Sequence, residues 1–351
     1  MALNDQLLAH HINTLKLAAN AGKTVNQYLD EMKQIIRKSV AGFDSDKRTA
    51  KRLTTLINTL ASQLNKPAGK WRKELEEQLK DFAKYEANYQ TSTIGGWIDA
   101  ELTQPTVNQV WAAAQFQPVS IGATKAVELT TLLDTWGVNE VNRLVMGVKL
   151  GFTQGLSTNQ IIRNVVGAGG LSDISKREAK GVAHDAIMHM ANAARFETYA
   201  ENDDIIIGYE LVVTLDGRTS DLCAAWPTGK VYKLTDTYQP MPPFHRWCRT
   251  TTSPKPSSEF DTFDQGATRA SKGADGGKVV SADTTYYGWL ADQPFEFQDM
   301  RLGKTKGQIF RNAGLTTEEF RKLSVDDLGR GLTIDEMADE DNKVKIYLGK
   351  R

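Results

Sequence analysis

The sequence predicts an α+β protein with a mostly helical N-terminal region, a small β-module that carries a Cys/His cluster, and a helical C-terminal tail. Three observations support this class. Apolar residues over roughly the first 90 positions recur at three- and four-residue steps, as on one face of a helix. After Asp203 the pattern changes to the β-branched run IIIGYELVVTL, which is typical of a strand. Roughly the last 70 residues return to short helical patterns.

Residues 1–120 are predicted to form a helical bundle, or an elongated helical arm that contacts a partner. Gly42 and Pro67 are expected to separate its helices, because both residues disfavour a continuous helix. The adjacent His10 and His11 are interpreted as a surface pair near a mobile end of the chain.

Residues 121–256 are expected to form a second unit, in which helices precede the β-module. Ser157 with Gln160 forms a capping box that begins one helix, and a long Ala-rich helix follows at about 174–200. In that helix, His184 and Asp185 are interpreted as exposed or interface polar groups and not as a catalytic pair.

Residues 257–283 contain few large apolar groups and are predicted to be a flexible linker. Residues 284–351 are then a helical tail. Capping boxes in the tail are predicted at Thr316 with Glu319 and at Thr333 with Glu336.

Both cysteines of the chain lie in the pattern D-x6-C-x21-H-x2-C, formed by Asp216, Cys223, His245 and Cys248. Thiolate and imidazole suit a tetrahedral Zn²⁺, and a carboxylate can complete the set. Asp216 is the weakest of the four, because an Asp in D-G-R-T-S also opens an Asx turn. Two alternatives stay open: a Cys223–Cys248 disulfide, or two unpaired buried cysteines with His245 bonded to a backbone carbonyl.

Other residues of the same stretch are expected to support the site. Arg218 and Arg249 can each make a bidentate bond to Asp216 or Asp221 and hold the turn shut, or they can contact a partner's carboxylates or a phosphate. Pro243, with the proline before it, gives the chain an extended approach to His245 and so fixes the position of the ring.

The stretch 214–252 resembles the phage head-morphogenesis family, the Mu F-like minor head proteins. The family signature is D-x-R-T-S-x2-C, then a G-K-V turn, then P-P-x-H-x2-C-R. It matches here at Asp216, Arg218, Thr219, Ser220, Cys223, Gly229, Lys230, Val231, Pro242, Pro243, His245, Cys248 and Arg249. The resemblance extends over roughly 149–337 and leaves 1–120 without a counterpart. Family members usually carry a Thr-Glu pair in the long helix, where this chain instead has His184, Asp185, His189 and Asn192.

The resemblance implies a minor head (minor capsid) protein of a tailed phage. Such a virion component associates with the portal protein or the major capsid protein, at the capsid interior or portal vertex. It is assembled in the host cytoplasm and acts in head morphogenesis, DNA packaging or viral DNA ejection.

The composition of the chain bears on which partners and which cellular compartment to expect. Lys plus Arg equals Asp plus Glu at 43 each, so no overall field draws the chain to DNA. Local DNA contact remains open through Arg301, Lys304, Lys306 and Arg311. No apolar run reaches membrane-spanning length and no secretory signal is recognisable, so we expect no membrane partner. Two cysteines in a chain of 351 residues favour a reducing compartment.

The chain contains none of the common nucleotide-binding, zinc-protease or serine-hydrolase motifs, and we therefore expect no enzymatic activity. The alternative function is a metal-dependent hydrolase or nuclease-like enzyme carried in the virion. It would require the Cys/His cluster to leave a metal coordination position open.

Overall fold

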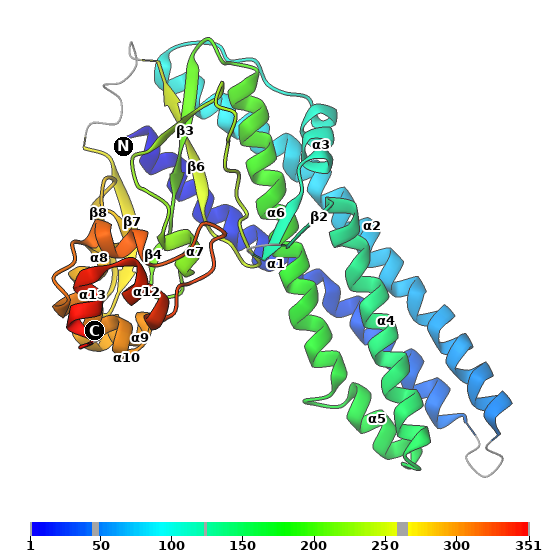
Figure 1. Cartoon of the computed structure of the whole chain (residues 1–351). Helices are drawn as coiled ribbons and strands as arrows, with labels where there is room; N and C mark the ends of the chain where they lie inside the picture. Colours follow the sequence, from blue (N-terminus) through cyan, green and yellow to red (C-terminus); the bar gives the residue numbers. More distant parts are fainter. Residues whose placement is uncertain (1, 44–48, 123–124, 258–265, 350–351) are drawn as a thin grey trace.

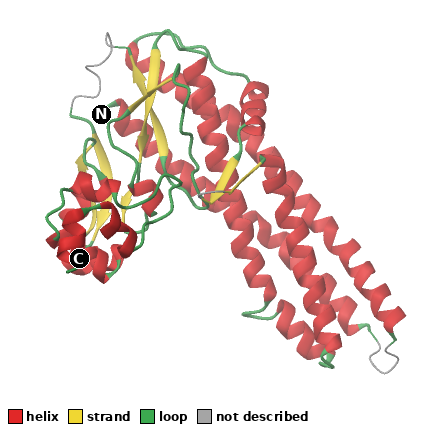
Figure 2. Ribbon diagram, viewed as in Figure 1, coloured by secondary structure: helices red, strands yellow, loops and turns green. Residues whose placement is uncertain are grey.

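The computed structural model describes residues 2–43, 49–122, 125–257 and 266–349. Long helices form an arm on one side of the molecule, and the strands and short helices lie together at the other side (Figures 1 and 2). This arrangement confirms the predicted α+β class. None of the helices in the described ranges is both long and apolar enough to cross a membrane.

The arm is built from five helices: α1 (Leu3–Ala41), α2 (Ala50–Ile98), α4 (Leu129–Thr153), α5 (Thr158–Val166) and α6 (Leu171–Ala200). One apolar core joins them all. In this core, the rings of Trp71 and Trp136 pack edge to face with their centroids 4.4 Å apart. Trp136 Nε1 also donates a hydrogen bond to the Ser175 carbonyl at 3.1 Å. The predicted boundary at residue 120 therefore does not separate two cores.

Helix α2 continues through Pro67, where the sequence predicted a break. Proline removes one backbone hydrogen bond of the helix. Leu60, Leu64, Trp71 and Leu75 on either side of it are nevertheless fully buried on one face, and this packing keeps the two halves in line. The prediction at Gly42 is confirmed, since α1 ends there.

Helix α3 (Val107–Phe116) and the short hairpin β1 (Val119–Gly122) and β2 (Lys125–Val127) connect α2 to α4. Val110 and Ala114 of α3 are buried in the arm core, so this connection lies against the arm.

Two small sheets form the β-part. In the first, β3 (Ile206–Val212) lies between β5 (Val231–Lys233) and β6 (Thr251–Pro256), antiparallel to both. In the second, β4 (Leu215–Asp216) pairs in parallel with β7 (Thr268–Gly273), which pairs with β8 (Gly276–Ser281). The short helix α7 (Asp221–Ala224) follows β4.

The flexible-linker prediction for 257–283 is wrong for residues 266–283, because β7 and β8 lie there. Their stability does not come from large apolar side chains, which are scarce in this segment. It comes from the strand pairing and from Arg269, which is buried and donates to the carbonyls of Val213 and, at 3.4 Å, Thr284. Residues 258–265 lie outside the described residues.

The tail consists of α8 (Tyr286–Ala291), α9 (Phe295–Leu302), α10 (Lys304–Asn312), α11 (Thr317–Lys322), α12 (Ile334–Glu340) and α13 (Asn342–Tyr347). Both predicted capping boxes are present, at the starts of α11 and α12. The tail shares one apolar core with the end of β3, with β4 and with both cysteines. Its buried tyrosines and phenylalanines therefore lie in the same core as Cys223 and Cys248. The tail helices lie together around the C-terminus, away from the far end of the arm (Figure 1).

Candidate metal centre

The three soft donors come from two places in the chain. Cys223 lies in α7, whose first turn is capped by Ser220: the Ser220 hydroxyl accepts from Cys223 N at 3.2 Å. His245 and Cys248 lie in the loop before β6, after the buried Pro243. The Sγ atoms of Cys223 and Cys248 are 3.7 Å apart, and Cys223 Sγ lies 3.1 Å from His245 Nε2. All three donor atoms lie within 4.8 Å of one another, so the cluster could hold a metal ion.

This geometry fits a tetrahedral metal ion. Two thiolates that each lie ~2.3 Å from Zn²⁺ at a tetrahedral angle are about 3.8 Å apart, close to the observed separation. Both cysteines are free thiols in the structure, which excludes the disulfide alternative for this conformation.

The imidazole of His245 is oriented for a ligand. Its Nδ1 lies 2.7 Å from the Arg246 carbonyl oxygen and donates to it, which leaves the Nε2 lone pair facing Cys223 and Ser220. Metal-binding histidines commonly donate their second ring N–H to a carbonyl in this way.

The electrostatics of the cluster favour a thiolate. Burial opposes ionisation of Cys248, but its interactions with Cys223 and His245 outweigh burial and lower the pKa of the Cys248 thiol well below its ordinary value. The pKa of the Cys223 thiol is raised by its hydrogen bond to Cys248 and by burial. Burial also opposes protonation of His245, but Cys248 outweighs it, and the pKa of His245 is raised.

Asp216 does not join the cluster, so the prediction that it is the fourth ligand is not supported by the geometry. Its carboxylate accepts a bidentate pair from Arg249, with Nη2 to Oδ1 at 2.8 Å, and also the backbone N–H of Arg218 at 2.9 Å. Thr219 Oγ1 donates to the same carboxylate at 3.2 Å. Burial opposes ionisation of Asp216, but Arg249 outweighs it and lowers the pKa of the carboxyl group. The predicted Asp216–Arg249 clamp is therefore present.

His184 and Asp185 are buried, contrary to the prediction of exposed or interface groups. The Asp185 carboxylate accepts from Trp247 N at 2.7 Å and pairs with Arg246 Nε at 3.2 Å. The pair therefore fixes the backbone between His245 and Cys248. The sequence signal for their burial is that Val182 and Ala183 precede the pair and Ala186 and Ile187 follow it in the helix.

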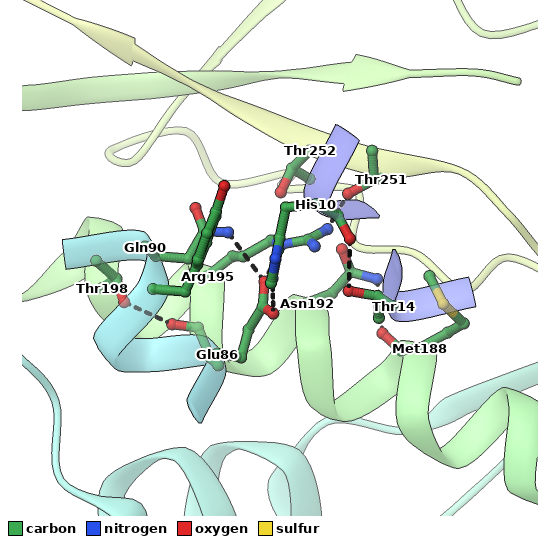
Figure 3. A network of polar contacts seen from close by, with 12 residues as sticks. His10, Thr14, Glu86, Gln90, Met188, Asn192, Arg195, Thr198, Thr251 and Thr252 are labelled. Atoms are coloured by element: carbon green, nitrogen blue, oxygen red, sulfur yellow. Dashed lines mark hydrogen bonds and ion pairs between the residues drawn. The ribbon is translucent and has the colours of Figure 1, made fainter. Parts of the chain in front are cut away.

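His10 and His11 are also buried, contrary to the predicted surface pair. His10 Nε2 lies 2.6 Å from the Glu86 carboxylate, which also accepts from Arg195 Nε at 2.8 Å (Figure 3). Arg195 also contacts the Thr251 hydroxyl of β6. This network joins α1, α2 and α6 to the first sheet.

The network also reaches the metal-centre loop. His11 Nε2 bonds to the Arg249 carbonyl at 2.9 Å, so the residue after Cys248 is fixed on both its backbone and its side chain. Periodicity could not predict this network, since its partners come from four separate elements.

Of the four cationic residues considered for DNA contact, two form ion pairs within the protein. Arg301 pairs with Asp221 at 2.8 Å, and Arg311 pairs with Asp299 at 2.8 Å.

Comparison with known proteins finds no matching family model, no similar curated protein and no similar solved structure.

Proposed function

We propose that the protein is a minor head protein of a tailed phage, located in the virion at the capsid interior or portal vertex. One observation carries the proposal. The signature residues that motivate it, although separated by more than 20 positions, contact one another as a unit: Asp216 with Arg249, Ser220 with His245, and Cys223 with Cys248. A chance sequence match would give no reason for these contacts.

In this proposal the β-part and tail form a rigid node, and the arm binds the portal or the major capsid protein. A groove of about 630 Å³ on the arm is suited to this contact. Leu17 of α1 and Phe82 and Tyr85 of α2 line it, and the side chains of Leu17 and Tyr85 are exposed. Exposed apolar groups gathered in a groove are typical of protein-binding surfaces.

Co-expression with the portal protein tests this function. The wild-type chain is expected to co-purify with portal rings, and Leu17→Asp is expected to abolish co-purification while leaving the helical content unchanged. Val279→Asp is the matched control, because Val279 is an exposed apolar residue of β8 outside the groove. If the wild-type chain binds neither the portal protein nor the major capsid protein, the proposal is contradicted.

We further propose that Cys223, His245 and Cys248 hold a structural Zn²⁺. When bound, the ion would join α7 to the loop before β6, and its binding free energy would add to the stability of the β-part. Purified protein is expected to contain about one zinc per chain, and Cys248→Ser is expected to lose it. Zinc-free protein that does not take up the metal would contradict the site.

A further inference from the structure

A small cavity borders the donor cluster. Its volume is about 20 Å³, and Ser220, Cys223, His245 and Thr250 are among the residues that line it. A cavity of ~10–15 Å³ can hold one water molecule when polar groups surround it. The two hydroxyls and the cluster supply such groups. The space next to the cluster therefore has room for a water molecule.

Within the described part of the chain, no fourth His, Cys, Asp or Glu joins the cluster. Among the residues that the structure describes, the metal-binding group consists of Cys223, His245 and Cys248 alone. Asp216 would have to leave Arg249 to reach it. The side chain of Arg249 is only 19% exposed, so leaving it unpaired would be costly.

Besides Arg249, which is paired with Asp216, the lining of the cavity contains the exposed guanidinium of Arg218, which could receive a small anion. The side chain of Arg218, which lines the cavity, is 81% exposed. Trp247, which also lines it, is 45% exposed. A linear monoanion could therefore place its end atom in the cavity and extend toward the exposed side chains.

We infer that the metal ion held by Cys223, His245 and Cys248 keeps its fourth coordination position for an exogenous ligand, a water molecule that a small monoanion can replace. The inference rests on the metal site proposed above. In zinc proteins, three protein ligands with one solvent position are typical of catalytic sites, whereas structural sites usually have four protein ligands. The ion inferred here would therefore stabilise the fold and still differ from an ordinary structural site in one position open to solvent.

Cobalt tests this position, because Co²⁺ takes the same donors as Zn²⁺ and its visible absorption changes with its ligands. Full-length protein is loaded with Co²⁺ and titrated with sodium azide. A saturable change in the visible bands is expected in the wild-type protein, in Asp216→Asn and in Ser220→Ala. The azide affinity of Ser220→Ala is expected to differ from that of the wild type, because the Ser220 hydroxyl lines the cavity. Cys248→Ser, which lacks one thiolate, should not form the thiolate–cobalt spectrum.

Each contrary result identifies its own cause. An azide response that is absent in wild type but present in Asp216→Asn would overturn the inference by making Asp216 the fourth ligand. A response found only in Ser220→Ala would overturn it in favour of the Ser220 hydroxyl. Normal cobalt binding without an azide response in any variant would show a closed site and leave the metal proposal standing. Failure to bind cobalt would overturn both.

Discussion

At the scale of single residues, the Asp216 carboxylate interacts with two guanidinium groups that differ in their exposure to solvent. Arg249 binds it with both Nη atoms and is mostly buried, whereas Arg218 Nη2 lies 3.8 Å away on an exposed side chain. A desolvated bidentate pair contributes far more than an exposed single contact, since removal of one partner leaves a buried charge. The two arginines therefore form an internal comparison.

We predict that Arg249→Ala lowers the free energy of unfolding by roughly 3 kcal/mol, because it leaves Asp216 buried without its partner. Arg218→Ala should change it by less than about 0.5 kcal/mol. Urea denaturation of the two variants measures the difference. Equal effects would show that the clamp is not the dominant interaction of Asp216.

Glu86 provides the clearest pH dependence. Burial opposes its ionisation, but Arg195 and His10 outweigh burial and lower the pKa of Glu86 from 4.5 to about 2. Because the folded-state pKa is below the ordinary value, the network stabilises the protein fully above pH 4.5 and loses this contribution as the pH falls toward 2.

Glu86→Gln is therefore expected to lower stability at neutral pH and to flatten the decline in stability between pH 4.5 and 2. Thermal unfolding across this range measures both effects. Glu77→Gln is the control, since Glu77 lies on the same helix with its side chain 65% exposed. If stability falls with decreasing pH as steeply in Glu86→Gln as in the wild type, Glu86 is not responsible for the loss of stability at acid pH.

The sequence identified the three soft donors and the Asp216–Arg249 pair, because their chemistry is local and their spacing is distinctive. It misplaced His10, His11, His184 and Asp185, which periodicity alone cannot distinguish from surface residues. Their burial depends on acceptors in other elements, such as Glu86 and the backbone of Trp247. Sequence spacing does not encode such long-range partners.

At the scale of elements, the β7–β8 hairpin depends on one buried arginine. Within the described part of the chain, Arg269 pairs with no carboxylate, and burial lowers its pKa to about 10. Its guanidinium donates to the carbonyls of Val213 and Thr284, and these bonds fix β7 against the end of β3. Composition suggested disorder here because polar strands of this kind lack the usual apolar alternation.

Arg269→Ala is predicted to release the hairpin and to make Lys272 and Lys278 early sites of trypsin cleavage. The wild-type chain should resist cleavage at these sites, because paired strand backbone does not fit a protease active site. Limited proteolysis followed by mass spectrometry reads out the cut positions. Lys272→Ala, an exposed change on the same strand, should leave Lys278 protected, and early wild-type cleavage at Arg269 would restore the linker interpretation.

At the scale of the whole molecule, the tail and the β-part depend on one another. Tyr287 is buried between Phe310 and Phe320, with ring centroids 6.0 and 5.2 Å away, in the core that also contains both cysteines. At the other side, Asp5 near the start of α1 accepts from Thr268 N of β7 at 2.8 Å. The units that the sequence suggested are therefore joined through shared surfaces, which composition along the chain does not reveal.

We predict that Tyr287→Ala lowers the free energy of unfolding by about 3–4 kcal/mol, as expected for loss of a fully buried ring. The same change should weaken zinc retention, because Tyr287 lies in the same core as both cysteines. Metal release to a chelator at increasing urea concentration measures both effects. Tyr347→Ala is the control, since Tyr347 is a partly exposed ring in the same tail. If the cluster retains its metal at urea concentrations at which the tail of Tyr287→Ala is unfolded, the metal site does not depend on the tail.

The proposed function requires the protein to be a component of a phage head. Quantitative mass spectrometry of purified procapsids and mature particles tests this most directly, with the portal protein as an internal reference. We predict that the chain is present in procapsids in a fixed ratio to the portal protein. Its absence from both kinds of particle, with abundant free protein in the same lysate, would contradict the account.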